Sequence, residues 1–234
     1  MTDDIAALSA SALIHAYRAR RLSPVEVTEA VLARLRRAEP HVNAFTLVDE
    51  EAALAAARAA EARWRRGAPC GLVDGVPTTI KDLILTRGWP TRRGSLSVDP
   101  GQSWQEDAPV SARLREHGAV FLGKTTTPEY GWKGVTDSPL SGVTRNPWAL
   151  HCTPGGSSGG AAVAAALGLG ALHIGTDGGG SIRIPAGFSG IVGLKPSFGR
   201  VPAHPLSPFG TVSHVGPMTR TVEDAALMLT VLAG

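Results

Sequence analysis

The stretch from Thr153 to Ala186 constrains the fold of this 234-residue chain more than any other. Two clusters of glycine and serine, residues 155–160 and 178–181, enclose one short apolar helix pattern and one short apolar strand pattern. Glycine inside regular structure costs about 0.5–1 kcal/mol relative to alanine. We therefore expect both clusters to be loops that bring backbone N–H groups close to a ligand or a reacting group.

The flanking sequence alternates between helix and strand patterns. Residues 107–117 predict a helix and residues 119–124 a buried strand, and residues 171–177 predict a second buried strand. In residues 72–85, β-branched side chains alternate around two turn-forming residues, which predicts a strand and a turn that present Lys81 at the strand end. This alternation predicts an α/β fold, and open α/β sheets place their ligands at strand ends.

The chain is long and apolar enough to bury a core of its own. With 43% hydrophobic residues, it predicts a single domain. Residues 1–70 predict an N-terminal helical layer, in which Ser23, Pro24 and Glu26 have the spacing of a capping box at a helix start. Residues 71–234 predict the sheet and the two glycine turns.

Composition and charge exclude several classes of protein. The chain has 23 basic and 20 acidic residues, and its arginines are scattered rather than interleaved with aromatic residues, which argues against a nucleic-acid partner. The acidic N-terminus and the lack of a long apolar run argue against secretion and membrane insertion. Cys70 and Cys152 form neither a disulfide framework nor a zinc pattern, and we expect Cys152 to be buried. We expect a cytoplasmic protein without a metal or other cofactor.

Two familiar motifs fit the first glycine turn poorly. A phosphate-binding P-loop needs Lys followed by Ser or Thr after its last glycine, whereas Ala161 and Ala162 follow here. The turn also matches G-x-S-x-G with Ser158 at its centre, the nucleophile elbow of α/β-hydrolases. An elbow should follow a strand directly, but the preceding residues predict a loop. The histidines that could serve such a serine as base are His173, His204 and His214.

The second turn offers a different arrangement for serine chemistry. Ser181 follows three glycines, Gly178, Gly179 and Gly180, whose N–H groups can converge on an oxygen atom as an oxyanion hole. A serine nucleophile needs a base. A buried lysine can serve, because burial disfavours its charge and lowers its pKa.

These motifs together resemble the amidase signature family of serine hydrolases. The resemblance rests on GGSSGG, on GTDGGGSIRIPA and on GVPTTIKD upstream, and it extends from about Ser23 to Gly234. It implies a mixed, largely parallel central sheet covered by helices on both sides. The family's members generally continue beyond the point where this chain ends, so the chain is expected to be truncated at its C-terminus.

The resemblance also implies roles for individual residues. Ser181 corresponds to the nucleophile, Ser157 to the serine that bridges the proton transfer, and Lys81 to the general base. The N–H groups of Gly178, Gly179 and Gly180, together with that of Ser181, correspond to the oxyanion hole. The peptide bond between residues 156 and 157 is implied to be cis. No metal site and no cofactor are implied.

Other residues near the two turns have supporting interpretations. Ser158 is expected to donate or accept a supporting hydrogen bond or to cap a helix. Asp177 and Arg183 flank the nucleophile and are expected to pair and brace its loop. Tyr130 and Trp132 are candidates for the acyl pocket, with local core as the alternative.

Three functions remain open at this point. The leading hypothesis is a hydrolase that cleaves the C–N bond of a small-molecule amide. The second is an amidotransferase subunit that releases ammonia from glutamine for partner subunits. The third is a non-catalytic fragment or assembly module. The sequence does not identify the substrate, and it leaves open a homodimer.

Overall fold

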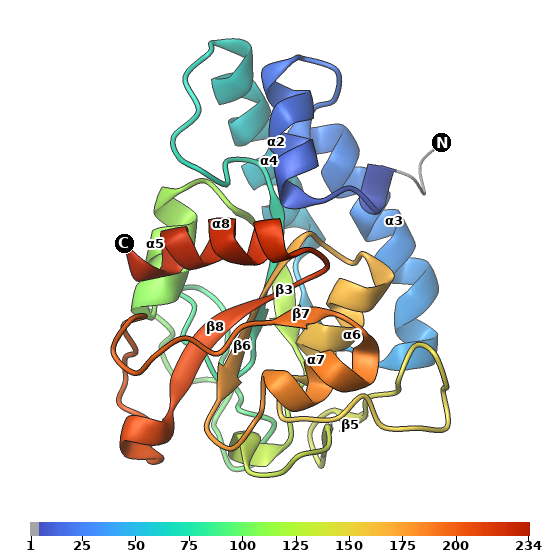
Figure 1. Cartoon of the computed structure of the whole chain (residues 1–234), viewed down its shortest axis with the longest axis vertical. Coiled ribbons are helices and arrows are strands. Elements are labelled where there is room, and N and C mark those ends of the chain that lie inside the picture. Colours follow the sequence, from blue (N-terminus) through green and yellow to red (C-terminus); the bar gives the residue numbers. More distant parts are fainter. Residues whose placement is uncertain (1–4) are drawn as a thin grey trace.

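A mixed sheet forms the centre of the molecule. The computed structural model describes residues 5–234, and within them the main sheet has six strands in the order β1-β3-β2-β6-β8-β7. Strands β3, β6, β8 and β7 are labelled in Figure 1. Strands β3, β2 and β6 are mutually parallel, whereas β1 runs antiparallel to β3, and β8 runs antiparallel to both β6 and β7. The strands are β1 (Phe45–Val48), β2 (Pro77–Lys81), β3 (Val120–Thr125), β6 (Leu172–Asp177), β7 (Val192–Gly193) and β8 (His214–Thr219).

The helices form where the sequence places caps and apolar faces. Ser23 and Glu26 form the reciprocal capping box expected at the start of α3, and the Thr221 side chain caps the start of α8. The helices are α2 (Ala10–Arg18), α3 (Pro24–Val42), α4 (Glu50–Arg65), α5 (Pro109–Glu116), α6 (Gly159–Leu167), α7 (Arg183–Ser189) and α8 (Val222–Ala233). A small hairpin of β4 (Asp137–Ser138) and β5 (Gly142–Val143) lies in the long segment between β3 and α6.

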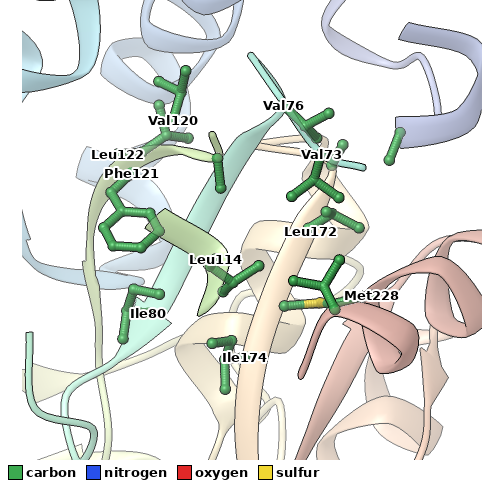
Figure 2. Close-up of a cluster of buried hydrophobic side chains, with 14 of the residues drawn as sticks. Val73, Val76, Ile80, Leu114, Val120, Phe121, Leu122, Leu172, Ile174 and Met228 are labelled. Carbon is green, nitrogen blue, oxygen red and sulfur yellow. The ribbon is translucent and has the colours of Figure 1, made fainter. Parts of the chain in front are cut away.

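Helices cover both faces of the sheet. On one face, Leu114 of α5 and Met228 of α8 pack with Leu172 and Ile174 of β6 in the largest apolar cluster (Figure 2). Helix α6 belongs to the smaller clusters, in which Ala162 packs with Met218 of β8. Successive residues of a strand face opposite sides of a sheet. In β8 this alternation places Val215 in the largest cluster and Met218 in the cluster of α6, so the predicted α/β fold with helices on both sides of a mixed sheet is confirmed.

The N-terminal layer shares the core of the sheet. Side chains from α2, α3 and α4 belong to the same apolar cluster as those of β2 and β3, and Leu13, Val31 and Ala57 are among them. In the part of the chain that the structure describes, no helix has both the length and the apolar character needed to cross a bilayer.

Two elements depart from the sequence patterns. Strand β8 contains Pro217, which cannot donate to a sheet and so weakens the strand pattern, but its carbonyl accepts a hydrogen bond from Leu194 N at 3.0 Å. Helix α7 is only seven residues long and contains Pro185, and the sequence patterns did not predict it.

Cys152 was expected to be buried, and this is wrong: both Cys152 and Cys70 are free and exposed.

A buried carboxylate joins α2 to α8. Asp224 of α8 is fully buried, and its carboxylate oxygens accept hydrogen bonds from Ala10 N at 3.0 Å and from Ser11 N at 3.1 Å. The Ser11 hydroxyl adds a third bond at 2.9 Å. These N–H groups belong to the first turn of α2, where no intrahelical acceptor exists.

Replacing Asp224 by alanine is expected to lower the free energy of unfolding by about 3 kcal/mol, because it leaves buried donors without an acceptor. Urea denaturation followed by circular dichroism measures the change. Glu223→Ala is the matched control, because Glu223 is adjacent and exposed. An equal effect of the two substitutions would contradict this role of Asp224.

Candidate active site

Lys81 lies where the carboxyl ends of three parallel strands meet. It is the last residue of β2, opposite Thr125 of β3, and the preceding Ile80 is opposite Ile174 of β6. Its side chain therefore lies beside Thr176, near the end of β6. The position at the strand end agrees with the sequence prediction for residues 72–85.

The amine of Lys81 is enclosed by hydroxyl groups. Its Nζ lies 2.7 Å from Ser157 Oγ, 2.8 Å from Ser158 Oγ and 2.8 Å from Thr176 Oγ1. Lys81 is fully buried, and among the described residues no carboxylate forms an ion pair with it. Burial lowers the pKa of Lys81 well below its usual range, and the charge of Asp177 opposes this only in part.

The first glycine turn is packed against the protein's own backbone. A Cβ atom on Gly156 would lie 2.5 Å from the carbonyl oxygen of Val135, and one on Gly160 would lie 2.5 Å from that of Ala44. The peptide bond between Gly156 and Ser157 is cis, as the resemblance implied. The glycines of this turn therefore permit a close approach that presents Ser157 and Ser158 to Lys81 at the start of α6.

Ser158 has a supporting position rather than a free hydroxyl. Its Oγ donates to the carbonyl oxygen of Thr176 at 3.2 Å and accepts from Thr176 N at 3.2 Å, in addition to its bond with Lys81. It is fully buried. These contacts tie the first turn to the end of β6.

Asp177 organises the second turn. Its carboxylate accepts hydrogen bonds from Gly180 N at 2.8 Å and Ile182 N at 3.2 Å, and it pairs with the Arg183 guanidinium at 2.9 Å. Burial acts to raise the pKa of Asp177, but the bonds from Arg183 and the backbone outweigh it and lower the pKa to about 2. The pairing of Asp177 and Arg183 thus agrees with the expectation from the sequence.

The bond from Gly180 alters the expected set of free N–H groups. The Gly180 N–H donates to the Asp177 carboxylate, so it is not free to donate to an oxyanion as the resemblance implied. Within residues 5–234, the N–H groups of Gly178, Gly179 and Ser181 have no acceptor. A Cβ atom on Gly179 would meet no atom within 4 Å, so this side of the turn is open.

A cavity of about 550 Å³ lies over the two turns. Ser157 and Ser181 both line it, together with Gly178 and Gly179, whereas Lys81 lies buried beneath. Tyr130 and Trp132 line it as well, which fits the first of the two interpretations of these aromatic residues.

Sequence reasoning missed several residues of this site. Thr176 contacts Lys81, and its position beside Asp177 at a strand end was the available signal. The segment 202–215 forms one wall of the cavity through Phe209, Val212 and Val215. The Phe209 ring stacks on that of Trp132, with centroids 5.8 Å apart. No motif marked this segment, because it approaches the site only through the tertiary fold.

The candidate histidines of a nucleophile elbow do not lie beside Ser158. His173 is buried, and its Nδ1 lies 2.8 Å from Thr79 Oγ1. His214 contacts the carbonyl oxygen of Asp177, and His204 is exposed near Glu106. In the described part of the chain, no histidine contacts Ser158. That part also contains no group of three or more His, Cys, Asp or Glu residues that could hold a metal ion.

The family model described as Amidase matches residues 26–234. The structure superimposes on a bacterial aryl acylamidase of the amidase signature family with a TM-score of 0.90 and 36% sequence identity. The chain belongs to the amidase signature family. Native peptide amidase from Stenotrophomonas maltophilia gives a TM-score of 0.89 at 36% identity. These two matches confirm the resemblance that the three motifs indicated.

Among curated proteins, this amidase signature chain is similar to a glutamyl-tRNA(Gln) amidotransferase subunit from Chloroflexus aggregans. The two are 45% identical over 228 residues. The match covers 97% of this chain and 46% of the relative, and the two structural matches each cover 97% of this chain and 48% of the other. The chain therefore spans about half the length of the relatives it matches.

Asp177→Asn is expected to alter the dependence of stability on pH. The folded-state pKa of about 2 lies below the ordinary value of 3.8, so Asp177 contributes stability above about pH 4 that is lost as the pH falls toward 2. Between pH 4 and pH 2, the free energy of unfolding of the variant should fall by about 2 kcal/mol less than that of the unaltered chain. Urea denaturation across this range measures the difference.

Asp99→Asn is the control for this measurement, because Asp99 is exposed. It should leave the pH dependence unchanged. If Asp177→Asn gave the same curve as Asp99→Asn, the charge-assisted bonds of Asp177 would not stabilise the turn.

Proposed function

We propose that this chain hydrolyses the C–N bond of carboxamides through an acyl-enzyme on Ser181. The observation that carries the proposal is the Lys81 amine, which is buried without an ion-pair partner in the described part of the chain and lies 2.7 Å from Ser157 Oγ. Lowering the pKa of a lysine favours its neutral form, and the neutral amine can accept a proton. Membership of the amidase signature family supports the same reaction class.

The hydroxyl contacts of Lys81 suggest how the neutral amine is oriented. A neutral amine has two N–H donors and one lone pair. The Ser158 hydroxyl donates its only proton to the carbonyl oxygen of Thr176. Toward Lys81 it can therefore act only as a hydrogen-bond acceptor. If the amine donates to Ser158 and Thr176, its lone pair is directed at Ser157. Ser158 and Thr176 are thus positioning residues, and Lys81 is the general base.

The proposed reaction begins with a proton relay. Lys81 Nζ accepts the proton of Ser157, and Ser157 Oγ accepts the proton of Ser181 as Ser181 Oγ attacks the carbonyl carbon. The carbonyl oxygen becomes an oxyanion, which the free N–H groups of Gly178, Gly179 and Ser181 stabilise. Asp177 holds Gly180 and thereby the shape of the turn.

The relay then runs in reverse. Lys81 returns its proton through Ser157 to the amine, the C–N bond breaks, and an ester remains on Ser181. Water attacks this ester while the same relay takes the water's proton, and the relay then gives this proton to Ser181 Oγ as the acid product leaves. The reaction consumes one amide and one water and requires no cofactor.

A second candidate function is to supply ammonia within an amidotransferase complex. The observation that favours it is the 45% identity to the glutamyl-tRNA(Gln) amidotransferase subunit from Chloroflexus aggregans. The same relay would then release ammonia from glutamine for use by partner subunits. Formation of an amidated product from glutamine only when such partner proteins are added would favour this candidate over independent hydrolysis.

Separate replacement of Lys81, Ser157 and Ser181 by alanine tests the relay. Each substitution is expected to lower kcat/KM for amide hydrolysis by about a thousandfold or more, because each removes one member of a unit. A coupled ammonia assay measures the rate. Lys195→Ala is the control, since within residues 5–234 the Lys195 amine hydrogen-bonds only the carbonyl oxygen of its neighbour Pro196. Retained turnover in Ser181→Ala would overturn the proposal.

The pH dependence of kcat/KM tests the role of Lys81. Because the base acts in its neutral form, the rate should rise with pH through the lowered pKa of Lys81 and level off above it. The charge of Asp177 raises this pKa, so Asp177→Asn should move the rising limb to lower pH, whereas Asp99→Asn should leave it in place. A shift to higher pH would contradict the assignment.

A further inference from the structure

The walls of the cavity above Ser181 are apolar. Ile184, which follows the nucleophile turn, lines the cavity, and so do Val212 and the stacked rings of Trp132 and Phe209. Leu83 lines the cavity just after Lys81. The volume of about 550 Å³ lies within the range of sites that enclose small organic ligands. The cavity can therefore hold a group of aromatic size.

The charged residues that line the cavity are all of one kind. They are Arg93 and Lys133, with His204 as a further basic group, and no Asp or Glu among residues 5–234 lines the cavity. An ammonium group that entered would lose water without gaining a carboxylate partner. Such a group would also meet the positive charge of Arg93, whereas the charge of Lys133 is paired with Asp137 at 2.8 Å. This lining disfavours a substrate that carries an ammonium group.

We propose that the cavity selects uncharged amides with an apolar acyl group about as large as a phenyl ring, in preference to glutamine. The proposal rests on the amide hydrolysis proposed above and names its substrate class. The apolar walls stabilise the acyl group by removing it from water. Glutamine carries an α-carboxylate, with which Arg93 can pair, but also an α-ammonium group, which would enter the apolar cavity without a carboxylate partner among the lining residues in 5–234.

Three primary amides with the same leaving group test the selection. Acetamide, phenylacetamide and glutamine all release ammonia, so one assay compares their kcat/KM values and isolates the acyl group. Burial of a phenyl group in the cavity corresponds to a gain of about ten- to hundredfold in kcat/KM. We expect phenylacetamide to exceed both other amides by at least about tenfold. A kcat/KM for glutamine or acetamide equal to or above that of phenylacetamide would overturn the proposal.

A matched pair of valine substitutions tests the wall itself. Val212 lines the cavity and is 53% exposed, and Val222 is 72% exposed and lies outside the lining, so both sites can accept an aspartate without loss of the fold. Val212→Asp should lower kcat/KM for phenylacetamide at least about tenfold, because a charge then faces the acyl group. Val222→Asp should leave it unchanged. Equal values for the two variants would contradict the proposed wall.

Binding to the Ser181→Ala chain separates this inference from the proposed function. Saturation-transfer NMR with phenylacetamide and glutamine requires no turnover. Phenylacetamide binding without any Ser181-dependent ammonia release would support the selection and overturn the hydrolysis. Ser181-dependent release from glutamine, with no phenylacetamide binding, would support hydrolysis and overturn the selection. Absence of binding by both amides would overturn the selection as well.

Discussion

The burial of one amine among hydroxyl groups is the constraint on which the site depends. Lys81 contacts Ser157, Ser158 and Thr176, and in the described part of the chain it has no carboxylate in ion-pair contact. A charged ammonium group in this position would lose its hydration without full compensation, so the neutral form is favoured. A neutral amine donates twice and accepts once, and the surrounding hydroxyl groups can satisfy both requirements.

The two glycine turns use glycine for different physical reasons. In the first turn, Gly156 and Gly160 leave room for neighbouring backbone, and a side chain there would collide with it. In the second turn, a side chain on Gly179 would meet no atom within 4 Å, and the Gly179 N–H has no acceptor in residues 5–234. The first turn is therefore a close-packed support, whereas the second exposes donors beside Ser181.

Asp177 links the electrostatics of the site to its shape. Its carboxylate holds the turn through Gly180, Ile182 and Arg183, and its charge also acts on Lys81. The Asp177 carboxylate forms no ion pair with the Lys81 amine, but its negative charge partly offsets the lowering of the Lys81 pKa by burial. One side chain thus influences both the geometry of the nucleophile turn and the proton affinity of the candidate base.

The sequence by itself determined several of the local elements and the family. Periodicity and caps predicted α3, α8 and the strand that ends at Lys81, because these depend on neighbours within a few residues. Only the tertiary structure decided which hydroxyl groups meet the amine, because Ser157 and Thr176 lie 76 and 95 residues away from it along the chain. It also decided that Pro217 sits within a strand and that the segment 202–215 forms a wall. Both depend on packing between distant segments, which no local pattern encodes.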